Sequence, residues 1–239
     1  MNKRWRDIAG CVSAILFMAS CSVVAQQQPD AAAVVRGVDS SVKNRIDRLA
    51  SYTVTEHYAV YRGKDETHQA ADMVVKTTYR KETGKSYEVV SQSGGAVWRN
   101  EVLGTLLDNE KRMSQPSNVG TALINSSNYD MKLDANIHEQ FNGRDCLVLD
   151  ITPKHNSQYL FKGKLWVDAQ DFAIVQLKGT ASKSAFFLAS AAEVVRQYDK
   201  MSGLPMATHA QAVSGSSLLG QTVVKIDYTD YQLQLTPGS

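Results

Sequence analysis

The chain has 239 residues, of which 43% are hydrophobic and 21% are charged, values that are ordinary for a globular protein. Its 26 basic and 24 acidic side chains nearly balance, and removal of residues 1–25, which hold three basic residues and one acidic residue, would leave equal numbers. A neutral chain argues against nucleic acid or an acidic surface as its partner. At this length a single domain of about 200 residues is the simplest organisation.

The N-terminus has the pattern of an export signal. Three basic side chains among the first six residues precede an apolar run over residues 8–25 that is too short and too interrupted to span a membrane comfortably. We therefore expect residues 1–25 to be a signal peptide cleaved after Ala25, followed by a polar linker over residues 26–33 and one domain over residues 34–239. The mature protein would be exported.

A second way of processing the N-terminus stays open. The sequence Met18-Ala19-Ser20-Cys21 resembles a lipobox ahead of a lipidated cysteine, although Leu is usual where Met18 stands. Lipidation at Cys21 would make the protein an anchored outer-membrane lipoprotein.

Cleavage after Ala25 leaves Cys146 without a second cysteine, so that it has no internal disulfide partner. We expect Cys146 to pack as a small apolar residue inside a strand. A reactive thiol or an intermolecular bridge is the alternative.

The first predicted element after the linker is a helix over residues 34–50, where apolar residues recur at spacings of three and four. Its apolar stripe consists of Val38, Val42, Ile46 and Leu49. A break at Gly37 is the alternative to a continuous helix, because Asp39 and Ser40 can restart one. The stripe should lie on a sheet.

Most of the remaining chain alternates apolar and polar residues between turn signals, which predicts an antiparallel meander of about ten strands. Asn142-Gly143 is the strongest local hairpin signal. Asp168 and Asp171 lie in the loop of another hairpin, where Asp is a good turn residue rather than half of a catalytic pair. The predicted strands cover residues 52–62, 71–80, 85–92, 132–141, 144–152, the two arms of the hairpin 163–179, 189–198, 206–213 and 221–235.

Helical spacing interrupts the strands once, from Trp98 to about Met113, and a shorter helix is predicted between Pro116 and Ser126. The first of these helices carries the apolar stripe Trp98, Val102, Leu103, Leu106 and Leu107. The ordinary interpretation is a helix packed on the sheet as core. The alternative, functional interpretation is that this helix forms a lid over an apolar cavity.

No catalytic or metal motif is present in the sequence. The five histidines never pair at a metal-ligand spacing, and there is no Cys-x-x-Cys, no Gly-x-Ser-x-Gly and no phosphate-cradling glycine loop. We therefore expect no catalytic residue, no metal and no cofactor, and the protein is predicted not to be an enzyme.

Four segments carry a resemblance to a known family: the strand 142–153, which begins Asn-Gly-Arg; the hairpin start 163–168, Gly-Lys-Leu-Trp-Val-Asp; the pair Leu204-Pro205; and the closing run 226–231, Ile-Asp-Tyr-Thr-Asp-Tyr. In this order they resemble the outer-membrane lipoprotein-sorting superfamily of LolA, LolB and RseB-like proteins. The resemblance implies a mostly β, α+β fold: an incomplete, curved antiparallel β barrel with N-terminal and inserted lid helices over an apolar cavity. It also implies a periplasmic, non-enzymatic protein that holds acyl chains of lipids or lipoproteins.

The chain departs from the carrier pattern of that family. Arg62, Arg80 and Arg99 lie in the early part of the chain, but none is followed by proline, so the family's latch arginine has no counterpart that we can assign. A divergent member is therefore expected, monomeric and binding lipid or lipoprotein. The alternative is an RseB-like envelope-stress sensor or accessory that grips a polypeptide partner on its concave sheet.

The face of the sheet that lines the cavity depends on register, because a slip of one residue exchanges the two faces of a strand. We expect the cavity to be lined by Trp98, Val102, Leu103, Leu106, Leu107, Leu147, Leu149, Leu165, Val167, Phe172 and Ile174.

Overall fold

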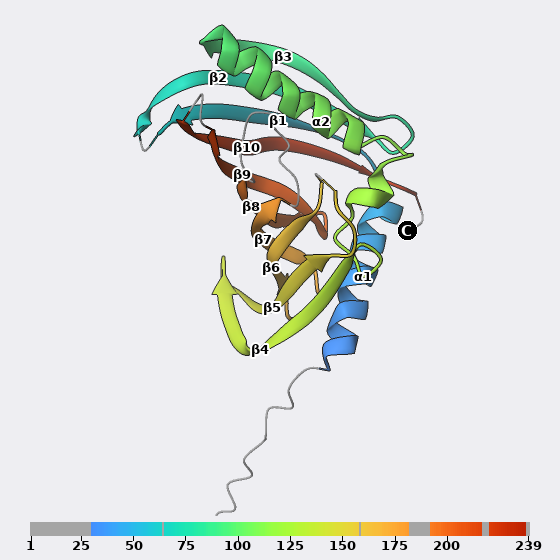
Figure 1. Cartoon of the computed structure of the whole chain (residues 1–239). Coiled ribbons are helices and arrows are strands. Elements are labelled where there is room, and N and C mark those ends of the chain that lie inside the picture. The colour runs from blue at the N-terminus through green and yellow to red at the C-terminus, as the bar shows by residue number, and fades with distance from the viewer. Residues whose placement is uncertain (1–29, 64, 158, 182–191, 217–219, 238–239) are drawn as a thin grey trace, which may run out of the picture.

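The computed structural model describes residues 30–237 except for residues 64, 158, 182–191 and 217–219 (Figure 1). The predicted signal peptide, both processing sites and the first four residues of the predicted linker lie outside the described residues.

Helix α1 (Ala31–Arg48) begins three residues before the predicted start, because Asp30 caps it by accepting a hydrogen bond from the Ala32 N–H at 3.1 Å. The helix runs through Gly37 without the break that the sequence allowed. At Gly37 a Cβ atom would lie 2.3 Å from the Phe172 ring. The glycine therefore permits close packing of α1 against the loop over residues 169–173, which contains Phe172. It does not end the helix.

The ten strands among the described residues belong to one antiparallel sheet in the order β3-β2-β1-β10-β9-β8-β7-β6-β5-β4. The pairing of β1 with β10 joins the two ends of the domain, and β3 and β4 form the two edges. The sheet is thus open, which confirms the predicted incomplete barrel. The strands are β1 (Leu49–Arg62), β2 (Asp65–Arg80), β3 (Gly84–Gly94), β4 (Tyr129–Phe141), β5 (Arg144–Pro153), β6 (Phe161–Asp168), β7 (Ile174–Ala181), β8 (Glu193–Met201), β9 (Leu204–Ser216) and β10 (Gly220–Leu235).

Two tight turns show why these strands form hairpins. Asn142 and Gly143 have φ angles of 49° and 73°, and Ser202 and Gly203 have φ angles of 53° and 76°. Positive φ at both central residues is what a two-residue type I′ hairpin requires. The hairpin predicted at Asn142-Gly143 is therefore confirmed.

Between β3 and β4 the chain forms a π-helical segment η1 (Trp98–Gly104), helix α2 (Thr105–Met113) and a short 3-10 helix η2 (Val119–Ala122). These elements confirm the predicted helical region from Trp98 to Met113. The second predicted helix is reduced to four residues.

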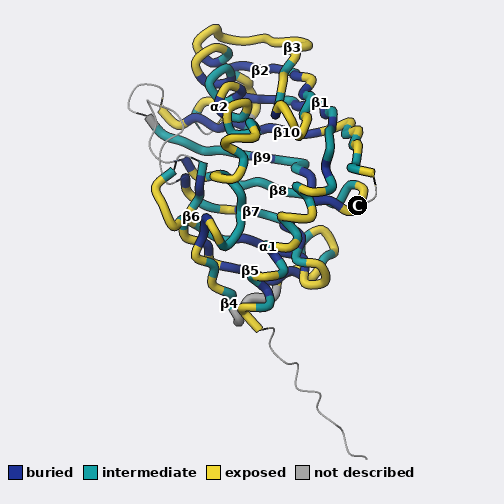
Figure 2. The backbone as a smooth tube through the Cα atoms, turned by 90° about the vertical axis from the view of Figure 1, so that its right-hand side faces the viewer, coloured by how far each residue is buried: buried dark blue, intermediate teal, exposed yellow. Residues whose placement is uncertain are grey.

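The helices cover one face of the sheet, which we call the inner face (Figures 1 and 2). The core on this face consists of two clusters. Over β1, β2, β9 and β10, η1 and α2 bury the first cluster, which includes Tyr58, Met73, Leu103 and Met206. Over β5, β6 and β7, α1 buries the second cluster, which includes Val38, Leu149, Leu165 and Leu177.

A third, small cluster lies on the opposite face, because strand residues alternate between faces. Its buried members are Cys146, Val148, Trp166 and Val175. Cys146 is 1% exposed, and its packing in β5 confirms the expectation of a small apolar role for this residue.

Candidate ligand-binding cavity

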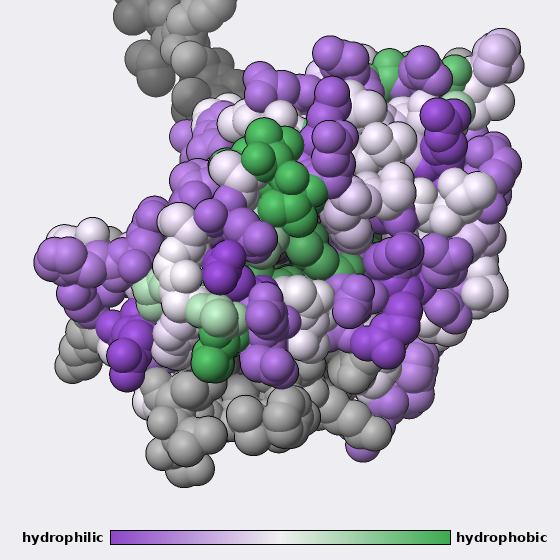
Figure 3. All heavy atoms as spheres, turned by 90° about the horizontal axis from the view of Figure 1, so that it is seen from above, coloured by the Kyte–Doolittle hydropathy of each residue, from purple (hydrophilic) through white to green (hydrophobic). Residues whose placement is uncertain are grey.

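A cavity of about 370 Å³ lies on the inner face between the two core clusters. It is lined by α1, by α2 with the segment that follows it, and by residues of all the strands except β5. Pockets for small molecules typically measure about 300–1,000 Å³, so the cavity is large enough to hold a ligand. Seen from above, the molecule is mostly hydrophilic, and a narrow strip of hydrophobic side chains crosses the middle of that view (Figure 3).

One side of the cavity is apolar and belongs to the half of the molecule that α1 covers. It presents aliphatic and aromatic side chains without a charge: Val42, Ile46, Leu123, Ile124, Phe161, Ile174 and Leu177. Burial of a ligand's methylene groups against such a wall is favourable by about 0.8 kcal/mol for each methylene.

Tyrosines are concentrated around the cavity. Seven of the ten tyrosines of the chain line it: Tyr52, Tyr79, Tyr129, Tyr159, Tyr198, Tyr228 and Tyr231. Burial raises the pKa of Tyr129 to about 12 and raises the pKa of Tyr228 well above its usual value. These hydroxyl groups therefore stay protonated at neutral pH and can donate hydrogen bonds.

The opposite side of the cavity carries a network of charged side chains. Glu110 on α2 forms an ion pair with Lys85 on β3, and its other oxygen lies 3.5 Å from a terminal guanidinium nitrogen of Arg196 on β8. Lys85 Nζ also lies 3.7 Å from Oε1 of Glu56, a residue of β1 with no exposed surface. Glu56 in turn accepts a hydrogen bond from the Tyr58 hydroxyl.

The ion pairs keep this network charged despite its burial. Burial alone would raise the pKa of Glu110, but Lys85 and Arg196 outweigh that effect and hold the pKa below its usual value. Burial would likewise lower the pKa of Lys85, but Glu110, Tyr52 and Glu56 raise it well above its usual value. Each charge is therefore stabilised by a partner of opposite sign, as buried ions require.

Positive charge is in excess around the cavity. Arg45 of α1 also lines it, and its Nε donates a hydrogen bond to the Pro205 carbonyl at 3.0 Å. With Lys85 and Arg196 it makes three cations against the carboxylates of Glu56 and Glu110. The five side chains carry a net charge of about +1 at neutral pH.

Of the eleven residues predicted to line the cavity, two line it and nine lie in or against the core clusters. Leu106 and Ile174 line the cavity. Trp98, Val102, Leu103 and Leu107 lie in the first core cluster instead. Leu147, Leu149, Leu165, Val167 and Phe172 lie in or against the second core cluster.

Sequence reasoning missed the charged and tyrosine residues of the cavity. A signal was available for the charged network beside the cavity, because Glu56 falls among Tyr52, Val54, Tyr58 and Val60 on the apolar face of a strand. A carboxylate at such a position must be buried, and a buried carboxylate needs a cation nearby.

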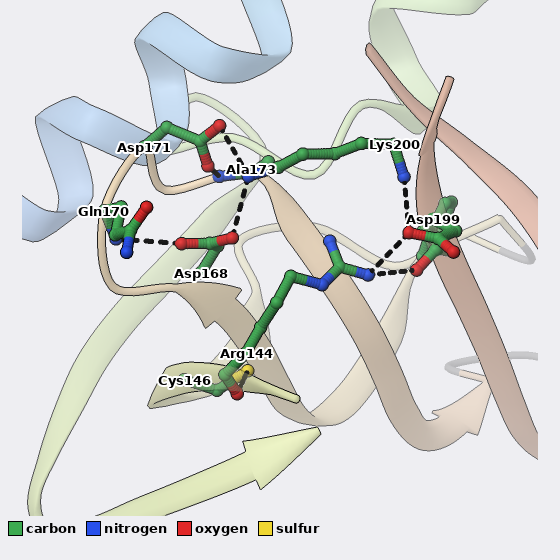
Figure 4. A network of polar contacts seen from close by, with 9 residues as sticks. Arg144, Cys146, Asp168, Gln170, Asp171, Ala173, Asp199 and Lys200 are labelled. Atoms are coloured by element: carbon green, nitrogen blue, oxygen red, sulfur yellow. Dashed lines mark hydrogen bonds and ion pairs between the residues drawn. The ribbon is translucent and has the colours of Figure 1, made fainter. Parts of the chain in front are cut away.

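Asp168 and Asp171 lie outside the cavity and brace the hairpin between β6 and β7 (Figure 4). Lys200 Nζ lies 2.7 Å from the carboxylate of Asp168 and 2.8 Å from that of Asp171. The same carboxylates accept hydrogen bonds from the backbone N–H groups of Gln170 and Ala173. Their predicted role as turn residues is confirmed.

Within the described ranges, no three His, Cys, Asp or Glu side chains are grouped as a metal ion would require. In the same part of the chain, no helix combines the length and the apolar character that a membrane crossing would need.

No protein-family model matches the sequence, and no curated protein matches it. Among solved structures, a LolA superfamily protein from Nitrosomonas europaea is similar, with 14% identity, a TM-score of 0.45, and coverage of 87% of this chain and 96% of the other. A DUF1329 family protein from Desulfovibrio piger has 15% identity and a TM-score of 0.41, covering 86% of this chain and 94% of its own. A domain assigned to an outer membrane lipoprotein-sorting protein from Vibrio parahaemolyticus has 12% identity and a TM-score of 0.44, covering 84% and 92%.

Proposed function

We propose that this chain is a non-enzymatic binding protein that holds an acyl chain of a lipid or lipoprotein in the cavity between its two core clusters. The observation that carries the proposal is the cavity of about 370 Å³ with an apolar side formed by α1, β6 and β7. An open sheet whose inner face is covered by helices provides such a space without any catalytic group.

The energetics of burial support an acyl ligand. A chain of roughly 14 methylenes gains about 0.8 kcal/mol for each one buried, or about 11 kcal/mol in full. Association costs about 4–15 kcal/mol, so full burial of one chain is of the size needed for binding. Partial burial would give correspondingly weaker affinity.

Titration of the purified protein with an environment-sensitive fluorescent acyl probe tests the proposal. We expect saturable binding at micromolar concentration that the variant Ala212→Trp abolishes, because Ala212 lines the cavity and an indole there would fill it. Thr180→Trp is the matched control, since Thr180 is an exposed residue of β7 that does not line the cavity. Absence of saturable binding to the unaltered protein would contradict the proposal.

The alternative partner is a polypeptide gripped on the concave sheet, as a stress sensor would do. In this chain α1 and η1–α2 already occupy the inner face, so a polypeptide would first have to displace a helix. We therefore favour the acyl ligand. Crosslinking in envelope extracts distinguishes the two, because the alternative predicts recovery of a polypeptide.

We propose export to the periplasm and a monomeric state for the mature protein. The intact mass of the purified protein tests the first point, since cleavage after Ala25 leaves Gln26 first whereas lipidation leaves a modified Cys21. Size-exclusion chromatography with light scattering tests the second.

A further inference from the structure

The two sides of the cavity differ in chemistry. The side formed by α1, β6 and β7 is apolar, whereas the side formed by β1, β3, β8, β10 and α2 presents Tyr52, Lys85, Glu110, Arg196 and Tyr228. A purely apolar ligand would cover this polar side without giving a partner to any donor that the protein leaves unpaired, and a buried unpaired donor is unfavourable. The division indicates a ligand that is itself divided into an apolar and a polar part.

Arg196 has hydrogen-bonding capacity that the protein does not use. Its side chain lines the cavity, one terminal nitrogen lies 3.5 Å from Glu110, and the guanidinium also interacts with the Tyr198 side chain. Its Nε is buried and has no hydrogen-bond partner within the described part of the chain. Because the guanidinium donors form a planar fork, Nε and a neighbouring terminal nitrogen can receive two oxygens of one anion.

The charge around the cavity favours an anion over a cation or a neutral group. Arg45, Lys85 and Arg196 exceed Glu56 and Glu110 by one positive charge. A single oxyanion would neutralise this excess. Glu110 need not be displaced, because Lys85 already holds it.

From these observations we propose that the cavity binds a long-chain amphiphile with one anionic oxygen group, a carboxylate or a phosphate, which accepts hydrogen bonds from the Arg196 guanidinium. The proposal rests on the function proposed above, and it narrows the ligand from any acyl chain to an anionic amphiphile. The acyl chain lies against Ile174 and Leu177, and the anion lies at Arg196.

Competition against the fluorescent acyl probe tests the proposal with ligands that share one chain and differ in the head. Hexadecanoate should bind about 10- to 100-fold more tightly than its methyl ester, the range expected for hydrogen bonds to a charged group. The variant Arg196→Gln should bind hexadecanoate about as weakly as the unaltered protein binds the ester. Arg80→Gln is the control, because Arg80 is exposed and does not line the cavity, and it should retain the full preference.

Hexadecyl phosphate and inorganic phosphate distinguish the source of the anion. Displacement of the probe by hexadecyl phosphate but not by inorganic phosphate supports the amphiphile. Displacement by inorganic phosphate alone would overturn it.

The two proposals can fail separately. Equal binding of hexadecanoate and its ester by the unaltered protein would overturn the anionic head group and leave acyl binding intact, and this comparison does not depend on whether any variant folds. A preference for hexadecanoate that Arg196→Gln retains would overturn the role of Arg196. If neither ligand nor the probe binds, both proposals fall.

Discussion

The two halves of the sheet are built on different principles, although a helix covers each. Beneath α1, the second core cluster is dominated by aliphatic side chains such as Leu149 and Leu165, both fully buried. Beneath η1 and α2, the first core cluster surrounds Glu56 and adjoins Lys85 and Glu110. Apolar burial stabilises the aliphatic core beneath α1 without requiring specific geometry. In the charged core beneath η1 and α2, the ion pairs must match in position to offset the cost of desolvation. The cavity lies where the two kinds of core meet.

Lys85→Met, in the charged half, should cause the largest loss of unfolding free energy. The change leaves Glu56 and Glu110 buried without their shared cation, and breaking a buried pair costs about 3–5 kcal/mol. Urea denaturation followed by circular dichroism measures the loss of unfolding free energy.

Lys178→Met is the matched control, because Lys178 is exposed on β7 and the change should stay within about 0.5 kcal/mol. If Lys85→Met lowers the free energy of unfolding as little as the control does, the charged network does not stabilise the half of the sheet beneath η1 and α2.

In the aliphatic half, Leu165→Ala should cost about 2–5 kcal/mol by leaving a void beneath α1. Because Leu165 does not line the cavity, the variant should keep the preference of the cavity for hexadecanoate over its ester. Loss of that preference at a temperature where the variant is folded would mean that the two halves are not independent.

The covering helices give a matched pair of glycine substitutions. Gly37→Ala should destabilise the protein by about 1–3 kcal/mol, because its Cβ would meet the Phe172 ring. Gly104→Ala should instead stabilise it by up to about 1 kcal/mol, because the backbone is helical there and the nearest atom lies at 3.6 Å. Thermal unfolding should show a lower melting temperature for Gly37→Ala and a higher one for Gly104→Ala. Equal destabilisation by both substitutions would contradict the closer packing at Gly37 than at Gly104.

The smallest effect should be the part of the pH dependence that Glu110 contributes in the charged half. The pKa of Glu110 is lower in the folded protein than its usual value of 4.5, so the ionised form stabilises the fold. This contribution is fully present above pH 4.5 and is lost as the pH falls through the lower folded value. Glu110→Gln should therefore flatten the acid side of the stability profile measured by urea denaturation, and an unchanged profile would contradict it.

Much of the fold could be predicted because its signals are local. Alternation along β1, the Asn142-Gly143 turn and the helical spacing from Trp98 to Met113 each depend on neighbouring residues in the chain. The order of the strands and the pairing of β1 with β10 do not follow from such signals. The resemblance implied an incomplete barrel, and it did not specify the order or that pairing.

Fewer residues of the cavity could be predicted, because the inserted helical region has two stripes of side chains that face in different directions. Trp98, Val102 and Leu103 form the more apolar stripe, and it packs down into the core. The neighbouring stripe faces the cavity and consists of Leu106, Asn109, Glu110 and Met113. Hydrophobicity alone selects the first stripe, and only tertiary packing reveals the second. In the same way, Val34 and Val38 of α1 cover part of β5 and β6 and leave Ile174 and Leu177 for the cavity.

Native mass spectrometry of the protein purified from the cells that make it tests the central claim most directly, with the Ala212→Trp variant measured beside it. If the cavity holds one acyl amphiphile, the unaltered protein should carry a single noncovalent adduct in the mass range of a lipid, and the filled variant should not. An unaltered protein that carries no such adduct, or an adduct that persists in Ala212→Trp, would contradict a ligand site between the two halves.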